Sequence, residues 1–162
     1  MNDFLIEMGV TGLTGRLKRL NDLFVYQTRQ FYEEQGVDIE PNWHMIFLLL
    51  EKHGSLTVTE IADAIQISHP AVIKLTHKMK KNGYVKSIRN PDDLRKQQLE
   101  LTKKAHETLP QLKKYWDAGE KSLNDLLEHN QELMIQLVKL EENLKELGFK
   151  DRMDNYSKNI TQ

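Results

Sequence analysis

Two short helices joined by only two residues constrain the fold of this chain more than any other part of its sequence. Thr57 and Glu60 are spaced as a capping box, in which the hydroxyl accepts from the backbone amide three residues on and the carboxylate reaches back. They predict a helix over about residues 58–65, with its buried face on Val58, Ile61, Ala62 and Ile65. Ser68, a favourable N-cap, begins a second helix after a connection of two residues. Helices connected this tightly form a helix-turn-helix.

The second helix is followed by a change from helical to extended patterning. It runs to about Asn82 and is ended by Gly83. A strand containing Tyr84, Val85 and Ile88 comes next, then the turn sequence Asn90-Pro91-Asp92-Asp93, and then a returning strand from Gln97 to Leu101. A two-stranded hairpin directly after a helix-turn-helix is a wing.

Long helices are predicted before this unit. The first covers roughly residues 10–35, because apolar residues stack on one face at Leu13, Leu17, Leu20, Phe24 and Phe31. Gly36 ends it, and Pro41 suits the first turn of the next helix. The apolar stretch 43–50 of that second helix is rich enough for nearly complete burial, and Gly54 closes the helix.

Further helices are predicted after the wing. Thr102 caps one over about 103–127, and another follows around 131–147, where leucines alternate in heptad-like steps of four and three at Leu133, Leu137, Leu140, Leu144 and Leu147. A lone chain would leave this seam and the 10–35 face in water, so we expect a homodimer in which both termini interlock across a two-fold axis. From Lys150 onward the chain is polar and is predicted to be a loose tail.

Composition excludes several classes of protein. The 162 residues, 39% of them apolar, suit one core of ordinary size, and the absence of cysteine excludes disulfides, thiolate nucleophiles and cysteine zinc sites. The longest aliphatic and aromatic run, Met45–Leu50, is far shorter than the roughly 20 residues of a membrane span. With no signal-peptide layout at the N-terminus, we expect a soluble cytoplasmic protein.

No pattern typical of a catalytic site stands out. Serine-histidine-acid, paired-carboxylate and glycine-rich phosphate patterns are missing, and none of the six histidines belongs to an H-x-x-x-H pair. We therefore expect no enzyme, no metal site and no cofactor.

Charge is distributed unevenly along the chain. Residues 68–104 hold ten basic and three acidic side chains, whereas residues 1–67 hold five basic and ten acidic, and residues 105–162 hold eight basic and eleven acidic. A positive segment inside an acidic chain is the pattern expected of a polyanion site, because lysines and arginines set against phosphates release condensed counterions. The alternative is an ordinary solvated helix face.

The hairpin contains Asp93, Arg95 two residues later, and Leu101 and Thr102 at the end of its second strand. In this pattern it resembles the wing of the MarR family of bacterial transcription regulators, which has an Asp, an Arg two residues later and a closing Leu-Thr. The resemblance spans roughly residues 10–147 and continues through Ile61-Ala62, Ser68, Lys74 and Gly83-Tyr84-Val85. It implies a mainly α fold with a small β-hairpin wing: an N-terminal dimerisation helix (1–36), a winged helix-turn-helix DNA-binding lobe (37–102) and C-terminal dimerisation helices (103–149), before the tail (150–162).

This resemblance and helix geometry together assign a DNA-binding surface. A major groove about 12 Å wide admits one helix, and the N-terminal end of that helix reaches base edges. The candidates for base contact are Ser68, His69, Ala71 and Lys74, with Lys78 a turn further on and better placed for phosphate. In the wing, Arg95 suits the narrow minor groove, and the resemblance implies that Asp93 orients its guanidinium; alternatively, Asp93 only caps a turn. Arg89 and Lys96 are assigned to the same surface.

Two features depart from the family pattern. Gln66 occupies a turn position where members often have Gly, so we expect a strained or differently shaped turn. Pro70, Ala71 and Ile73 replace hydroxyl residues and donate no side-chain hydrogen bonds, so direct readout is expected to rest on His69, Lys74, thymine-methyl contacts and DNA shape.

An effector pocket is also implied by the resemblance, between the dimerisation helices and the DNA-binding lobe. Its candidate lining residues are Tyr26, Trp43, His44 and Phe47. Buried aromatic residues of this kind are more often plain core, and that alternative is favoured.

The sequence therefore predicts a homodimeric, sequence-specific transcription regulator, a repressor that occludes a promoter by binding a pseudo-palindromic operator in double-stranded DNA and is released by a small-molecule effector. One alternative is an architectural DNA-binding protein with little sequence preference. Another is a protein-interaction dimer that has lost operator binding. An enzyme or accessory subunit is the reading with the least support.

Overall fold

The computed structural model describes residues 3–89 and 97–160, with side chains described up to residue 158. The chain divides into two compact units, Met1–Leu112 and Lys113–Gln162, and each is considered by itself. The division falls inside one continuous helix.

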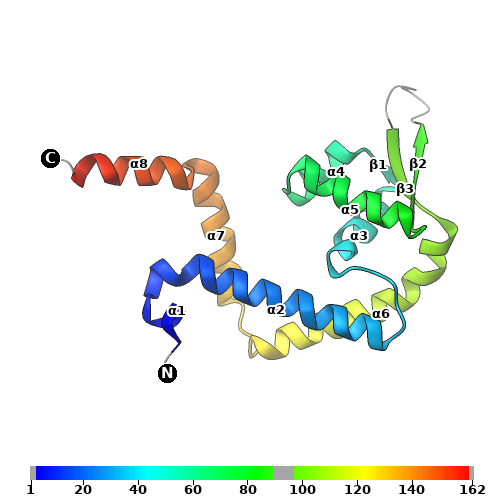
Figure 1. Cartoon of the computed structure of the whole chain (residues 1–162), viewed down its shortest axis with the longest axis horizontal. Helices are drawn as coiled ribbons and strands as arrows, with labels where there is room; N and C mark the ends of the chain where they lie inside the picture. Colours follow the sequence, from blue (N-terminus) through cyan, green and yellow to red (C-terminus); the bar gives the residue numbers. More distant parts are fainter. Residues whose placement is uncertain (1–2, 90–96, 161–162) are drawn as a thin grey trace. The chain divides into compact units, whose positions relative to one another are not determined.

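The first unit contains a series of helices and a small sheet (Figure 1). Two short segments, α1 (Phe4–Glu7) and the 3-10 turn η1 (Gly9–Gly12), precede the long helix α2 (Leu13–Glu34). The lobe that follows comprises η2 (Pro41–Trp43), α3 (His44–His53), β1 (Ser55–Leu56), α4 (Val58–Ile65), α5 (His69–Lys81), β2 (Val85–Arg89), β3 (Gln97–Leu101) and the beginning of α6 (Lys103–Leu126). The second unit holds the rest of α6, α7 (Glu132–Glu146) and α8 (Phe149–Ile160).

The predicted helix-turn-helix is confirmed, and the capping box begins it. The Thr57 hydroxyl accepts a hydrogen bond from the Glu60 amide (3.2 Å), and the Glu60 carboxylate accepts one from the Thr57 amide (2.7 Å). Ser68 occupies the N-cap position of α5, but its hydroxyl makes no capping bond. The Thr57 cap therefore stabilises its helix start with side-chain hydrogen bonds, whereas the Ser68 hydroxyl contributes none.

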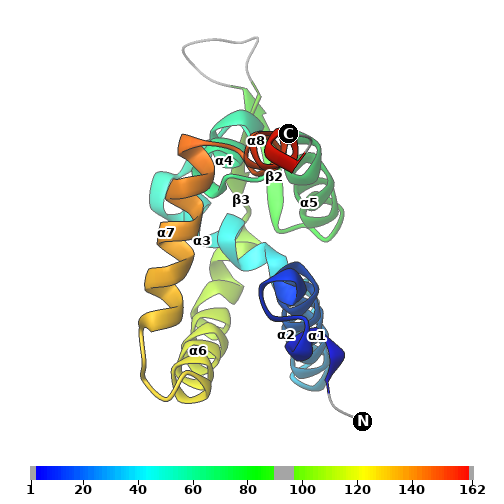
Figure 2. The same ribbon diagram turned by 90° about the vertical axis from the view of Figure 1, so that its left-hand side faces the viewer.

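The sheet has three antiparallel strands in the order β1-β3-β2. β2 and β3 form the predicted hairpin, with Val85 opposite Leu101 and Ser87 opposite Leu99. β1, which pairs Ser55 with Glu100, was not predicted because two residues are too few to show an alternating pattern. In Figures 1 and 2 the hairpin runs beside α5, which contacts β2. The predicted turn at 90–93 lies outside the described residues.

The core of the lobe is built around aromatic contacts. Trp43 and Phe47 are buried, and both meet the ring of Tyr84 edge-on, with centroids 6.0 and 5.5 Å away. Ile61, Val72, Met79, Leu99 and Leu112 complete the core from the other helices and the sheet. Stretch 43–50 is less completely buried than predicted, because Leu48 remains 43% exposed.

The first predicted helix begins later than expected. Gly9 has a positive φ of 56°, and Gly12 is buried so tightly against the backbone of Leu5 that a Cβ there has no space. These glycines set off a separate N-terminal turn before α2 begins at Leu13. The end of the helix before Gly36, with φ 67°, is as predicted.

The predicted loose tail is wrong as regards secondary structure, because α8 covers most of it. Arg152 donates to the carbonyl groups of Asn143 and Leu147 at the end of α7, over 2.6 and 2.9 Å. Lys150 and Asp154 form an ion pair one turn apart. These contacts order a segment that has no buried apolar face of its own.

Candidate nucleic-acid interface

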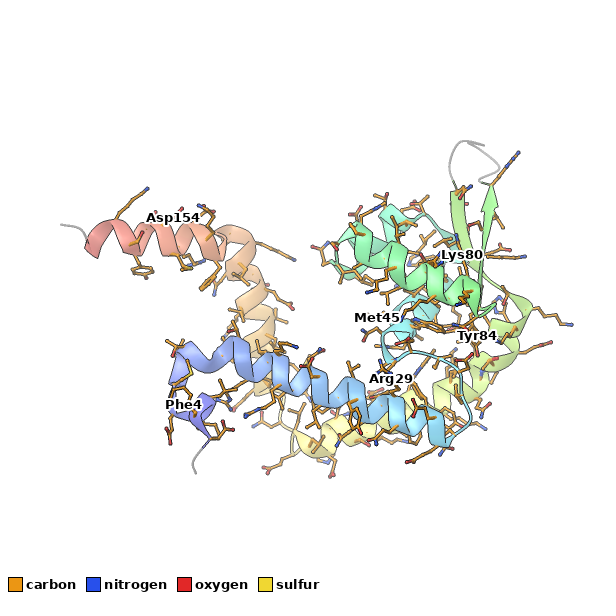
Figure 3. The ribbon with its side chains drawn as sticks, in the orientation of Figure 1. Phe4, Arg29, Met45, Lys80, Tyr84 and Asp154 are labelled. Atoms are coloured by element: carbon orange, nitrogen blue, oxygen red, sulfur yellow. The ribbon has the colours of Figure 1, made fainter. Side chains whose placement is uncertain are left out.

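The second helix of the helix-turn-helix, α5, has one buried and one exposed side. Val72, Thr76 and Met79 face the core. The exposed side chains are His69, Pro70, Ile73, Lys74, His77, Lys78, Lys80 and Lys81. Since successive residues are about 100° apart around a helix, Pro70 and His77 lie near the middle of this face and Lys78 lies at its edge. Side chains on this face are shown in Figure 3, where Lys80 is labelled.

The exposed side of α5 is positive. The helix contains four lysines and no acidic residue, and β2 adds Lys86 and Arg89, both exposed. Lys80 donates to the Ser87 hydroxyl over 2.6 Å, and Lys86 pairs with Glu100 over 2.7 Å. Within the described parts of the chain, Lys74 and Lys81 have no ion pair, so their charges face solvent.

The structure exposes most of the α5 residues that the sequence assigns to base contact. Ser68, His69 and Lys74 are exposed in the first two turns. Ala71 is half-buried and lies toward the edge of the exposed face. Five exposed residues of α5 were not assigned to this surface by the sequence analysis: Pro70, Ile73, His77, Lys80 and Lys81. The helical period of α5, counted from its buried residues, is the signal that places them on the exposed side.

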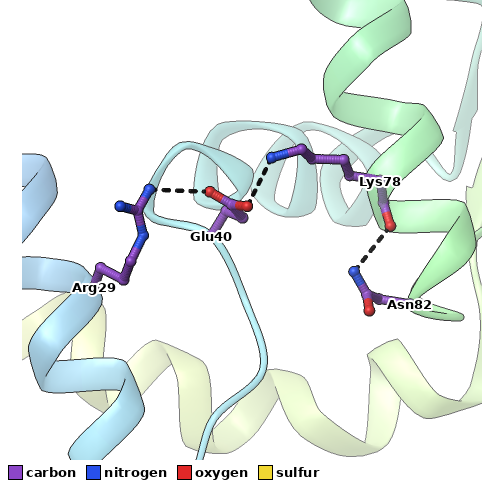
Figure 4. Close-up of polar contacts among 4 residues, drawn as sticks. All are labelled: Arg29, Glu40, Lys78 and Asn82. Atoms are coloured by element: carbon purple, nitrogen blue, oxygen red, sulfur yellow. Dashed lines mark hydrogen bonds and ion pairs between the residues drawn. The ribbon is translucent and has the colours of Figure 1, made fainter.

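Lys78 has a partner that no sequence pattern indicated. Its ammonium Nζ lies 2.8 Å from Oε1 of Glu40, whose other oxygen lies 3.3 Å from Nη2 of Arg29 on α2 (Figure 4). The hydrogen bond from Lys78 is the main cause that lowers the pKa of Glu40 below its usual value, against the opposing effect of burial; Arg29 adds to the lowering. The Asn82 amide also donates to the Lys78 carbonyl, over 3.1 Å.

The turn between α4 and α5, predicted to be strained or differently shaped, has a left-handed residue at Gln66. Gln66 has φ 52° and ψ 40°, a region that glycine occupies at less cost. Its side-chain amide donates to the Asp63 carbonyl over 2.6 Å, a bond that glycine lacks. The side-chain hydrogen bond of Gln66 therefore stabilises the turn that glycine would form through its greater backbone freedom.

The wing is described only at its base. Arg89 ends β2, is exposed and stands opposite Gln97 in the register of the hairpin. Asp93, Arg95 and Lys96 lie outside the described residues, so their assignments stay predictions.

The four proposed effector-binding residues lie in different environments. Trp43 and Phe47 are part of the core, His44 is half-buried with its Nδ1 2.9 Å from the Pro41 carbonyl, and Tyr26 is 56% exposed. A hollow of about 400 Å³ in this lobe is lined instead by Leu50, Glu51, His53, Gly54, Ser55, Glu100, Leu101 and His106. The effector assignment stays a prediction.

The described segments, residues 3–89 and 97–160, contain neither a metal-binding cluster nor a membrane-spanning helix. No three His, Asp or Glu side chains in these segments are grouped as a metal ion requires. No helix in the same segments is long and apolar enough to cross a membrane.

Comparison with known proteins confirms the resemblance. The model of the MarR family matches residues 37–96, a range that contains the helix-turn-helix and strand β2. The structure is similar to that of the S. aureus MepR–DNA complex (TM-score 0.71, 20% identity, 82% of this chain and 97% of that chain). It is also similar to a MarR/EmrR family transcriptional regulator from Acinetobacter (0.70, 20%, 83% and 96%) and to a mutant E. coli MarR complexed with operator DNA (0.61, 18%, 90% and 99%). No curated protein sequence matches this chain.

Proposed function

Because the model of the MarR family matches residues 37–96, we propose that this protein is a homodimeric transcription regulator that binds double-stranded DNA with sequence preference. The observation that carries the proposal is the exposed side of α5, which has lysines, no acidic residue and the position of a recognition helix. A helix in this position whose charged side chains are all basic meets the phosphate backbone favourably and reaches the major groove.

Base readout is assigned to the first two turns of α5. Ser68, His69 and Lys74 bring hydrogen-bonding groups to the groove, and Ile73 brings an apolar surface suited to the methyl group of thymine. Ala71 contributes at the edge of the same surface. With so few donors, part of the specificity comes from DNA shape.

The wing is assigned to the minor groove and its phosphates. Among the wing residues assigned from the sequence, Arg89 is the one that the structure describes. Arg95, oriented by Asp93, and Lys96 complete the assignment, as the family resemblance implies.

Homodimerisation is supported by apolar surface on two helices. On α2, Leu13, Leu17, Leu20, Leu23 and Phe24 are each between 39% and 47% exposed, and on α7 Leu133, Leu140 and Leu144 are between 38% and 49% exposed. Leucine-rich faces of this size mark an interface in a soluble protein. A second copy covers them by two-fold symmetry and places two recognition helices on a pseudo-palindromic operator.

Regulation is assigned to occlusion of the promoter by the dimer, with release by a small molecule that changes the spacing of the two recognition helices. Tyr26 and His44 are the accessible residues of the candidate effector site, whereas Trp43 and Phe47 shape it from the core. The complexes of MepR and MarR with DNA support the DNA-binding part of this proposal.

The experiment compares binding to DNA from upstream of the protein's own gene with binding to scrambled DNA of equal length, at several salt concentrations. We expect tighter binding to the upstream sequence and a linear fall of log affinity with log salt. Equal affinities indicate the architectural alternative, and no binding to either duplex indicates a protein-interaction dimer. Either result contradicts the proposal.

A further inference from the structure

Glu40 lies between the long helix α2 and the recognition helix α5. It sits at the start of η2 in extended conformation, and its neighbours Ile39 and Pro41 are both buried. The backbone on either side is thus fixed by the core, while the carboxylate remains about one-third exposed. The position of the carboxylate is set by the fold of the lobe.

Each carboxylate oxygen of Glu40 contacts a cation from a different helix. Oε1 lies 2.8 Å from Nζ of Lys78 on α5, and Oε2 lies 3.3 Å from Nη2 of Arg29 on α2 (Figure 4). The two partners keep the pKa of this carboxyl below its usual range, so the group is negatively charged at neutral pH. Lys78 therefore faces a full negative charge.

This pairing opposes a contact between Lys78 and DNA. A phosphate oxygen that approaches the ammonium comes close to the Glu40 carboxylate as well, and two negative charges sharing one lysine repel each other. Lys78 also lies at the edge of the exposed face of α5. Its ion pair with Glu40 must therefore break, and its side chain must extend outward, before the ammonium contacts a phosphate away from the carboxylate. Lys74 on the same helix has no such competitor among the described residues.

We propose that Glu40 competes with DNA phosphates for Lys78 and thereby lowers the affinity of the recognition helix for any duplex. This inference rests on the proposed DNA-binding function. Glu40 carries no sequence information in this role, because Lys78 is assigned to the backbone and not to bases. Its effect on specific and scrambled DNA is the same.

The test uses the full-length protein and measures affinity for the upstream and scrambled duplexes as salt is varied. Replacing Glu40 by glutamine (Glu40→Gln) keeps the shape of the side chain and removes its charge. An exposed ion pair is worth about 0.2 to 1 kcal/mol, so we expect Glu40→Gln to tighten binding to both duplexes by a factor of about 1.4 to 5. One additional phosphate contact steepens the salt slope by about one.

Two controls separate this competition from a general charge effect. Asp38→Asn makes the same change in net charge on the same connection, two residues away, and is expected to tighten binding much less. In a Lys78→Met background, Glu40→Gln is expected to give no gain, because the cation for which it competes is gone. Thermal unfolding monitored by circular dichroism checks that each variant is folded.

Three results overturn the inference. They are wild-type or weaker binding by Glu40→Gln, an equal gain in Asp38→Asn, and an undiminished gain in the Lys78→Met background. If the wild-type protein binds neither duplex, the proposed function itself fails. If the wild type binds DNA and Glu40→Gln binds with the same affinity, only the inference about Glu40 fails.

Discussion

Lys74 and Lys81 present the same charge at opposite ends of the exposed face of α5, and the difference in position predicts a difference in role. Lys74 lies within the first two turns, where a side chain reaches base edges, and a good base contact is worth about 1 to 3 kcal/mol of discrimination. We expect Lys74→Ala to narrow the affinity gap between upstream and scrambled DNA. Lys81→Ala, the matched control, is expected to weaken binding to both duplexes alike, and a uniform loss in both variants contradicts readout by this helix.

Arg95 and Asp93 give a second prediction for single residues. If Arg95 contacts the minor groove and Asp93 orients its guanidinium, as proposed, Arg95→Ala is expected to weaken DNA binding and Asp93→Ala is expected to weaken it less. Affinities measured by fluorescence anisotropy, with circular dichroism unchanged, provide the comparison. Wild-type affinity in both variants would mean that the wing makes no productive contact.

The lowered pKa of Glu40 predicts a pH-dependent contribution to stability. Because the folded-state pKa lies below the ordinary value of 4.5, the unfolded chain binds the proton more readily, and the contribution is present above that value and lost as pH falls through the folded-state pKa. We expect wild type to be slightly more stable than Glu40→Gln at pH 7, with the difference vanishing in acid. Urea unfolding at a series of pH values measures this, and a difference that persists in acid excludes the ion pair as its cause.

Single residues also show where prediction from sequence stops. Ser68, His69 and Lys74 are exposed in the N-terminal part of the helix-turn-helix's second helix, which caps and helical periodicity predict because they are local signals; their contact with bases stays a prediction. The partner of Lys78 is 38 residues away in the chain and is brought near by tertiary packing, so no spacing rule indicates it. Periodicity counted from Val72, Thr76 and Met79 places Ile73, His77 and Lys81 outward, but the sequence alone does not say which residues are buried.

At the level of secondary structure, the two helix starts of the helix-turn-helix allow a matched comparison. Thr57 makes both bonds of a capping box, whereas the hydroxyl of Ser68 caps nothing. We expect Thr57→Ala to lower the free energy of unfolding by about 1 kcal/mol and Ser68→Ala to lower it by clearly less. Chemical denaturation of the two variants provides the measurement, and an equal loss in both contradicts the assignment of the caps.

The same elements explain which parts of the fold the sequence predicts. The helix-turn-helix and the hairpin were predicted because glycines, caps and period-two alternation mark them locally. β1 was missed because it is an addition to β3 only two residues long, and its identity depends on pairing with a distant strand. α8 was missed because its polar composition hides the pattern Phe149, Met153 and Tyr156, which is spaced as one helix face.

At the scale of the whole molecule, the apolar faces of α2 and α7 predict assembly. Leu140 belongs to the leucine seam and is 38% exposed, whereas Lys139 projects from another side of the same helix. We expect Leu140→Glu to shift the protein from dimer to monomer and, with it, to weaken DNA binding. Sedimentation at micromolar concentration measures the shift, with Lys139→Glu as the control that remains dimeric; a wild type that sediments as a stable monomer contradicts the assembly.

These exposed leucines also bear on how steeply the protein responds to its own abundance. If only the dimer binds DNA tightly, the dimer concentration rises with the square of the protein concentration as long as that concentration is below the dimer dissociation constant. Doubling expression then raises promoter occupancy roughly fourfold in that range. The exposed leucines of α2 and α7 would thereby set a protein concentration below which the regulated promoter remains largely unoccupied.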